Sequence, residues 1–102
     1  MAVDMIKGTA KGYCRVAGDG ALQSGSFNVA SSSKQGTGFF RVVWNTDFTN
    51  TLYTSSMVCE QSSALGNIQV RAIATTHLDS QSFDTSGSTQ DAAIQVSAWG
   101  DQ

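Results

Sequence analysis

The chain has 102 residues and a mass of 10.7 kDa, which is the size of one domain. Six Lys and Arg residues against eight Asp and Glu residues give a net charge of -2, so the sequence has no basic footprint for nucleic acid. It also lacks the run of about 20 apolar residues that a membrane-spanning helix needs, and we expect no membrane insertion.

Alternating apolar and polar residues, not a helical period, run through the chain. This pattern is typical of half-buried strands, which favour β-branched and aromatic residues. In chain order it predicts strands within residues 13–16, 27–29, 40–44, 53–59, 68–74 and 94–98.

Four of these strands have a defined apolar face. One face is expected to consist of Phe27 and Val29; a second of Phe40, Val42 and Trp44; a third of Tyr53, Met57 and Cys59; and a fourth of Ile68, Val70, Ala72 and Ala74.

Turn signals separate the strands at residues 18–20, 36–38, 65–67 and 85–88. Their spacing is close to the rhythm of about 8–12 residues found in all-β sandwiches and barrels. The sequence therefore predicts an all-β fold: a single small antiparallel β-sandwich of about six or seven strands at residues 11–102, preceded by an N-terminal arm at residues 1–10.

The strand at residues 40–44 carries apolar residues on both faces, because Phe39 and Val43 lie opposite Phe40, Val42 and Trp44. In a two-layer sandwich one face of each strand meets solvent. We expect another subunit to cover this second face; the alternative is that Phe39 packs locally under a loop.

Two cysteines, Cys14 and Cys59, are too few and too far apart for a metal site of the CxxC type. The first seven residues have no basic start and no apolar segment of the kind that directs export. We therefore expect free, half-buried thiols in a protein made in a reducing cytoplasm.

Residues with catalytic potential are few. His77 would be the base of a Ser–His–Asp triad, but no Gly-x-Ser-x-Gly elbow accompanies it. We interpret it as a surface or loop histidine, with a metal site on the axis of a trimer as a remote alternative. A polysaccharide hydrolase would need paired carboxylates, for which Glu60, Asp79 and Asp84 are the candidates.

Most acidic residues are better explained as turn residues that bond to nearby backbone groups. The glycines at 36–38 lack the lysine and the following helix of a phosphate-binding loop. We therefore assign no catalytic, cofactor-binding or metal-binding residue, and expect a protein that is not an enzyme.

Several short motifs occur in a familiar order. Residues 11–18 read KGYCRVAG, 25–32 read GSFNVASS, 36–44 read GTGFFRVVW, 50–53 read NTLY, and 94–100 read IQVSAWG. This order resembles the C-terminal domain of many bacteriophage tail-fibre and related virion proteins. Phe40 stands where that family usually has tyrosine and Trp44 where it has phenylalanine, whereas residues 60–93 match poorly.

The resemblance implies a homotrimeric β-structure on the outside of a phage particle, which touches the host cell surface. The implied partners are further copies of the chain, other virion proteins and a host glycan or protein. The Phe39/Val43 face or Trp99 would lie in the trimer contact.

The family's domain usually ends a much longer fibre, whereas only about ten residues precede it here. An alternative is therefore a capsid decoration or tail accessory protein, attached through an arm with Val3, Met5 and Ile6 that adds to a partner's sheet. A polysaccharide hydrolase is a distant third.

Overall fold

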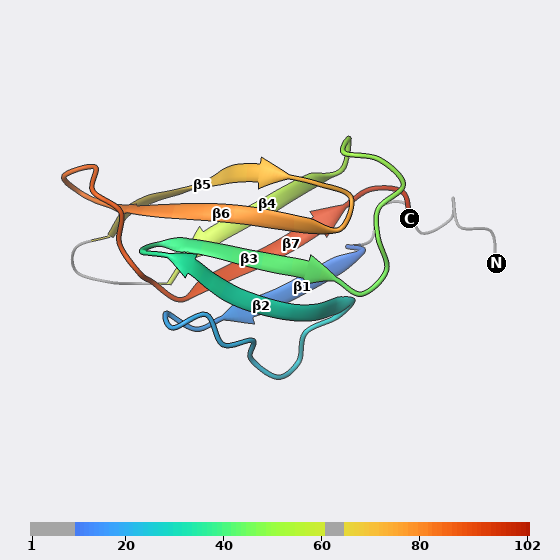
Figure 1. Cartoon of the computed structure of the whole chain (residues 1–102), viewed down its shortest axis with the longest axis horizontal. Helices are drawn as coiled ribbons and strands as arrows, with labels where there is room; N and C mark the ends of the chain where they lie inside the picture. Colours follow the sequence, from blue (N-terminus) through green and yellow to red (C-terminus); the bar gives the residue numbers. More distant parts are fainter. Residues whose placement is uncertain (1–9, 61–64) are drawn as a thin grey trace.

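The structure, a computed structural model, describes residues 10–60 and 65–102. Within them there are seven strands and no helix (Figure 1). The strands are β1 (Gly12–Val16), β2 (Val29–Gly36), β3 (Phe39–Trp44), β4 (Thr54–Cys59), β5 (Leu65–Ile73), β6 (His77–Asp84) and β7 (Ile94–Trp99).

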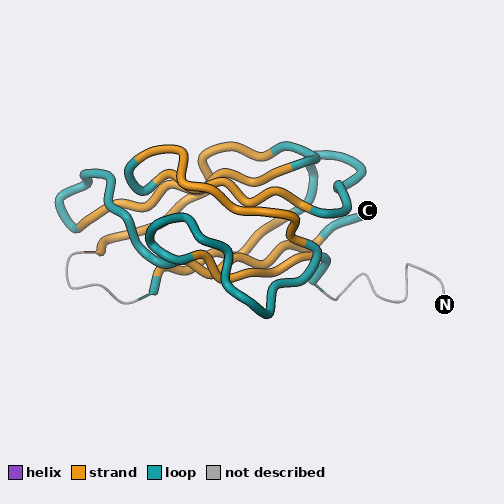
Figure 2. The backbone as a smooth tube through the Cα atoms, turned by 60° about the horizontal axis from the view of Figure 1, so that its bottom comes forward, coloured by secondary structure: helices purple, strands orange, loops and turns teal. Residues whose placement is uncertain are grey.

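Two antiparallel sheets are stacked face to face, one behind the other in Figure 1 and seen obliquely in Figure 2. The three-stranded sheet has the order β1-β7-β4, and the four-stranded sheet has the order β2-β3-β6-β5. The predicted all-β sandwich of six or seven strands is thus confirmed. The expected arm falls mainly on residues 1–9, which lie outside the described residues, so Val3, Met5 and Ile6 have no described position.

The core lies between the two sheets and takes the alternating apolar residues of both. The predicted inward faces of β3 and of the Tyr53–Met57–Cys59 strand are confirmed. The buried cluster consists of Cys14, Val16, Phe40, Val42, Trp44, Phe48, Tyr53, Leu78, Ile94, Val96 and Ala98, with Leu22, Val29, Met57, Cys59 and Ile68 packed against it.

The chain passes from one sheet to the other at Asn28. Phe27 pairs with Tyr13 beside the three-stranded sheet, whereas Val29 pairs with Trp44 in the four-stranded sheet. Asn28 between them has a positive φ of 56°, a conformation that Asn tolerates better than most residues. The prediction that Phe27 and Val29 share one strand face was therefore wrong, because the left-handed residue between them breaks the alternation.

β6 was not predicted, since its sequence HLDSQSFD lacks an apolar alternation. It is nevertheless a central strand, paired with both β3 and β5, and it is buried on both faces from Leu78 to Ser82. Polar side chains fit there because most find partners: the Ser82 hydroxyl, for example, donates to the Gln90 carbonyl at 2.7 Å.

β5 departs from the predicted pattern at two places. Its pairing with β6 shifts between Leu65 and Asn67 and again between Val70 and Ala72. The predicted turn at residues 65–67 is therefore the start of a strand, where an irregularity accommodates the glycine. The second shift interrupts the predicted alternation between Val70 and Ala72. Of the predicted apolar face, Ile68 packs on the core, whereas Val70 is exposed.

The other predicted turns are confirmed at residues 18–20, 36–38 and 85–88. Gly38 has a φ of 68°, and a Cβ there would lie 2.6 Å from the Ser82 carbonyl oxygen. This position therefore admits no side chain. Among the described residues no helix could span a membrane.

Candidate functional site

The outer face of the three-stranded sheet presents two rows of side chains that run across its strands. The strand register places Tyr13 beside Ser97, and Ser97 beside Ser56. In the next row, Arg15 lies beside Gln95, and Gln95 beside Val58. These residues point away from the core because Cys14 and Val16 occupy the alternate, inward positions of β1.

An exposed aromatic pair stands at one side of this face. The rings of Tyr13 and Phe27 are stacked, with centroids 5.6 Å apart and an interplanar angle of 26°. Backbone hydrogen bonds hold Phe27 in place: its N–H donates to the Tyr13 carbonyl at 2.9 Å, and the Tyr13 N–H donates back at 3.0 Å. Tyr13 is nevertheless 46% exposed and Phe27 51% exposed. Two large rings of one chain are thus fixed in place and open to a ligand.

A groove of about 490 Å³ runs beside the pair, within the range of about 300–1,000 Å³ typical of small-molecule sites. It is lined by Tyr13, Cys14, Arg15, Ser24, Gly25, Ser56, Val58, Gln95, Val96 and Ser97. Small side chains from β7 and β4 and the Ser24–Gly25 loop leave the hollow open. The lining is therefore an aromatic wall with hydroxyl and amide groups next to it.

Among the described residues that line the groove, Arg15 is the only charged one, and an ion pair neutralises its charge. Arg15 donates through Nε and Nη2 to the two carboxylate oxygens of Glu60, the Nη2–Oε1 distance being 2.6 Å. The hydrogen bond from Arg15 lowers the pKa of Glu60, and Gln95 contributes in the same direction. Glu60 is therefore ionised at neutral pH, and the groove has almost no net charge.

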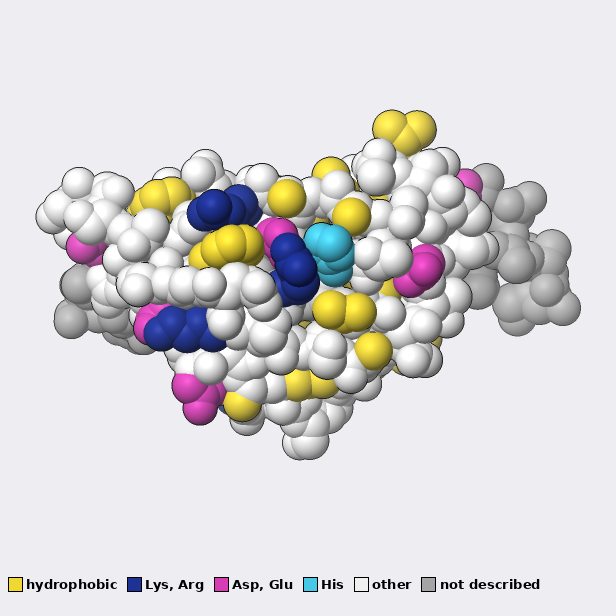
Figure 3. Space-filling model, viewed as in Figure 1, with side chains coloured by type: hydrophobic (Ala, Val, Ile, Leu, Met, Phe, Trp, Pro, Cys, Tyr) yellow, Lys and Arg dark blue, Asp and Glu magenta, His cyan; other side chains and the backbone are white. Residues whose placement is uncertain are grey.

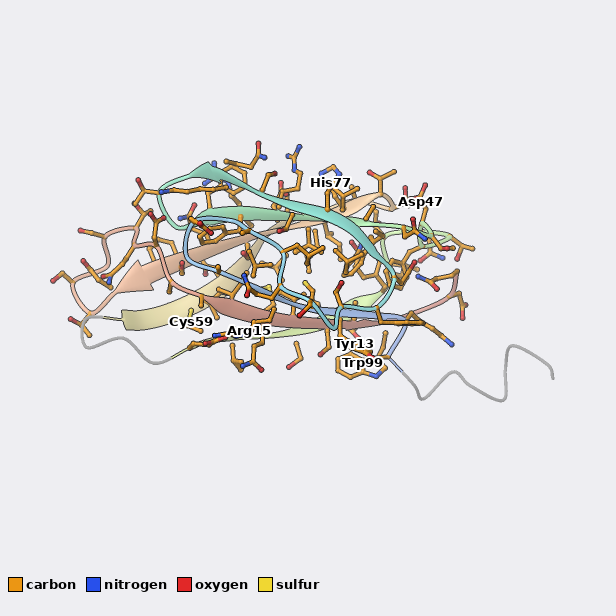
Figure 4. The ribbon with its side chains drawn as sticks, turned by 90° about the horizontal axis from the view of Figure 1, so that it is seen from below. Tyr13, Arg15, Asp47, Cys59, His77 and Trp99 are labelled. Carbon is orange, nitrogen blue, oxygen red and sulfur yellow. The ribbon has the colours of Figure 1, made fainter. Side chains whose placement is uncertain are left out.

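Trp99 projects from the same sheet face as Tyr13 and Arg15, as the view in Figure 4 shows. Its register partner is Thr54 on β4, and it lies two residues beyond Ser97 on β7. It is half-buried. Aromatic residues therefore extend along this face beyond the groove itself.

On the opposite surface, the outer face of the four-stranded sheet, charged side chains lie among scattered hydrophobic ones (Figure 3). Arg41 donates to both carboxylate oxygens of Asp79, at 2.8 and 3.0 Å, and Asp79 is only 3% exposed. The Arg71 guanidinium lies 4.1 Å from the centroid of the Phe39 ring. Phe39 is thus covered in part by a side chain of its own chain, so its apolar character has an explanation within one subunit.

The structure does not gather the predicted catalytic candidates into one site. Glu60 is held by Arg15, and its lowered pKa is the opposite of what a glycosidase general acid needs. Asp79 is held by Arg41 on the other sheet. Asp84 accepts from the N–H groups of Ser86 and Ser88, which confirms the turn interpretation for this residue.

His77 was interpreted as a surface or loop histidine. It lies half-buried on the outer face of the four-stranded sheet, as the first residue of strand β6 and not in a loop. Its Nδ1 lies 2.9 Å from the Thr76 hydroxyl. Over residues 10–60 and 65–102, no three His, Cys, Asp or Glu residues of one chain are grouped as metal ligands.

Both thiols are free, as predicted, with Cys14 buried and Cys59 half-buried. Their side chains face the core from β1 and β4, and β7 lies between these strands. Cys14 is paired with Val96 and Cys59 with Ile94, so two strand spacings and a two-residue offset separate them. Their Cα atoms are therefore about 12 Å apart, beyond the roughly 7 Å that a disulfide allows. Burial raises the pKa of Cys14 to about 11.

The groove residues were not predicted from the sequence as a site, although one signal was present. If Cys14 and Val16 face inward, Tyr13 and Arg15 must share the outer face. The contributions of Phe27, Ser56 and Glu60 had no local signal, because their positions depend on pairing across the sheet.

In comparisons with known proteins, no family model, curated protein or solved structure matches the chain.

Proposed function

We propose that the chain is a structural protein of a bacteriophage particle: a tail-fibre-like module that is exposed on the virion and binds the host cell surface. The motifs at residues 11–59 and 94–100 support the phage origin. The observation that carries the binding role is the exposed Tyr13–Phe27 stack beside the groove on the three-stranded sheet. Exposed apolar groups that lie together on one face are a feature of interaction sites.

The first experiment locates the protein on the particle. Gold-labelled antibody against the chain is applied to intact phage and viewed by electron microscopy. Label on the tail or its appendages supports the proposal. Label spread over the head overturns it in favour of the alternative, a capsid decoration protein.

The second experiment tests attachment to cells. Purified protein, fluorescently labelled, is incubated with cells of the bacterium on which the phage grows, over a range of salt concentrations. Saturable binding that survives high salt is expected, because the groove is nearly uncharged. Failure to bind at any salt concentration overturns the adhesin role.

We further propose that the module is a homotrimer, as its resemblance to fibre domains implies. Val43 and Trp99 are the candidate contacts, since both are half-buried on outer sheet faces. Multi-angle light scattering of the purified chain should give three times the monomer mass. A monomer would overturn the trimer without affecting the groove.

A further inference from the structure

The chemistry of the groove limits what it can bind. Its aromatic wall offers ring faces, and the faces of aromatic rings carry partial negative charge that attracts weakly positive C–H groups. Phe27 covers one face of the Tyr13 ring, and about half of each residue stays exposed. A flat, C–H-rich ring is the natural partner for such a surface.

Hydroxyl groups stand next to this aromatic wall. Ser56 and Ser97 are cross-strand neighbours on β4 and β7, and Ser24 lies in the adjoining loop. Within the described residues no hydrogen bond occupies their hydroxyls, each of which can both donate and accept. A ligand that itself carries many hydroxyl groups can therefore pair with them in either direction.

The charge balance points to a neutral ligand. Arg15 is the one charged residue in the described part of the lining, and it donates to both carboxylate oxygens of Glu60. An anionic ligand would have to compete with this charge-assisted pair, and a cationic ligand finds no free carboxylate in the lining. The charge of the groove therefore favours neither acidic nor basic ligands.

We propose that the groove beside Tyr13 binds a neutral oligosaccharide, with one sugar ring stacked on Tyr13 and neighbouring hydroxyls bonded to Ser56 and Ser97. This inference rests on the proposed function, because it assigns a ligand to the same cell-binding face. The groove has the volume of a small-ligand site, whereas a protein partner needs a contact of about 800 Å² on each side.

The test uses the full chain on an array of neutral and acidic glycans. The neutral probes are cellohexaose, maltohexaose and uncharged O-antigen fragments; the acidic probes are oligogalacturonate and sialylated glycans. We expect binding to at least one neutral probe and none to the acidic set. Multivalent display compensates for weak single-site affinity. Binding confined to acidic probes, or to no neutral probe, overturns the inference.

Variants then assign the binding to the groove. Tyr13→Ala should weaken neutral-glycan binding about tenfold or more, and Ser56→Leu, which fills the groove, should abolish it. Leu52→Ala is the matched control, since Leu52 is an exposed apolar residue that does not line the groove. Unchanged binding by both groove variants, with native circular dichroism spectra, overturns the assignment.

A third variant tests the role of charge. Glu60→Gln releases Arg15 and gives the groove a positive charge, so the variant should gain affinity for oligogalacturonate. If the variant kept the preference of the wild type for neutral over acidic glycans, the charge balance of the groove would not determine the ligand.

Cell binding by the same samples separates the two proposals. Cells bound without any neutral glycan would overturn this inference and leave the proposed function standing. Binding to a neutral glycan without attachment to cells would overturn the proposed function and leave this inference standing.

Discussion

The Trp44 indole donates a hydrogen bond to the Tyr53 hydroxyl, at 3.2 Å, and this bond joins the two layers of the sandwich. Trp44 ends β3 in the four-stranded sheet, and Tyr53 precedes β4 in the three-stranded sheet. The Tyr53 hydroxyl also lies 2.7 Å from the Ala74 carbonyl and 3.0 Å from the His77 carbonyl. One hydroxyl thus satisfies a buried donor and ties two strand ends together.

Replacing Tyr53 by phenylalanine should therefore destabilise the fold by about 1–3 kcal/mol, because the Trp44 N–H loses its buried acceptor. Urea unfolding measures the change. Tyr13→Phe is the matched control, because it also removes a tyrosine hydroxyl. Tyr13 is exposed, so this change should alter the free energy of unfolding by less than about 0.5 kcal/mol. Equal effects in the two variants would contradict the bridging role.

Two buried serines on β6 should respond to alanine in opposite ways. Ser82 donates to the Gln90 carbonyl at 2.7 Å, whereas the buried Ser80 hydroxyl has no partner among the described residues. Ser82→Ala should cost about 1 kcal/mol, while Ser80→Ala should be neutral or stabilising because it removes an unsatisfied polar atom. Thermal denaturation of both variants checks this. A clear loss of stability in Ser80→Ala would mean that a bound water serves its hydroxyl.

Because of Asp91, the free energy of unfolding should depend on pH in the acidic range. Its carboxylate pairs with Lys34 and accepts from the Gly38 N–H at 2.6 Å, and the Lys34 hydrogen bond is the main cause of its lowered pKa. The folded state therefore gains stability above the ordinary pKa of 3.8, and this gain is lost as the pH falls towards the lowered value.

Asp91→Asn should consequently be less stable than the wild type at pH 7, and the difference should shrink as the pH falls below about 4. Urea unfolding over this pH range measures it. Asp47→Asn is the control, since Asp47 is exposed and has no side-chain partner within the described part of the chain. A constant difference at all pH values would contradict the proposed linkage.

The two thiols should react at different rates. Burial raises the pKa of both, to about 11 for Cys14, and Cys59 is less buried. Because the thiolate is the reactive form, Ellman's reagent should label Cys59 first and Cys14 only on unfolding. Mass spectrometry after mild oxidation should find no internal disulfide, and a loss of two hydrogens would contradict the separation of β1 and β4.

Much of the fold could be predicted from local patterns. The alternation in residues 40–44 located β3 and its inward face, and the patterns near Tyr13, Met57 and Val96 located three more strands. These predictions hold because the side-chain period of two is a local property, set by backbone geometry alone.

The candidate site was only partly predictable. That Tyr13 and Arg15 share a face follows from the alternation with Cys14. That Arg15 meets Glu60, 45 positions later, depends on β7 lying between β1 and β4. No single stretch of sequence contains this strand order, and the charge balance of the groove depends on it.

The sequence by itself determined which segments are extended and which of their faces are apolar, because burial selects apolar residues at every second position. Only the tertiary structure decided the rest. It made the polar strand β6 central, since Arg41 and nearby backbone carbonyls bond to most of its buried side chains. It also turned the chain between sheets at Asn28 and set Phe27 against Tyr13. These outcomes arise from pairings between residues that are distant in the sequence. The free energies of such pairings cannot be predicted from a local sequence pattern.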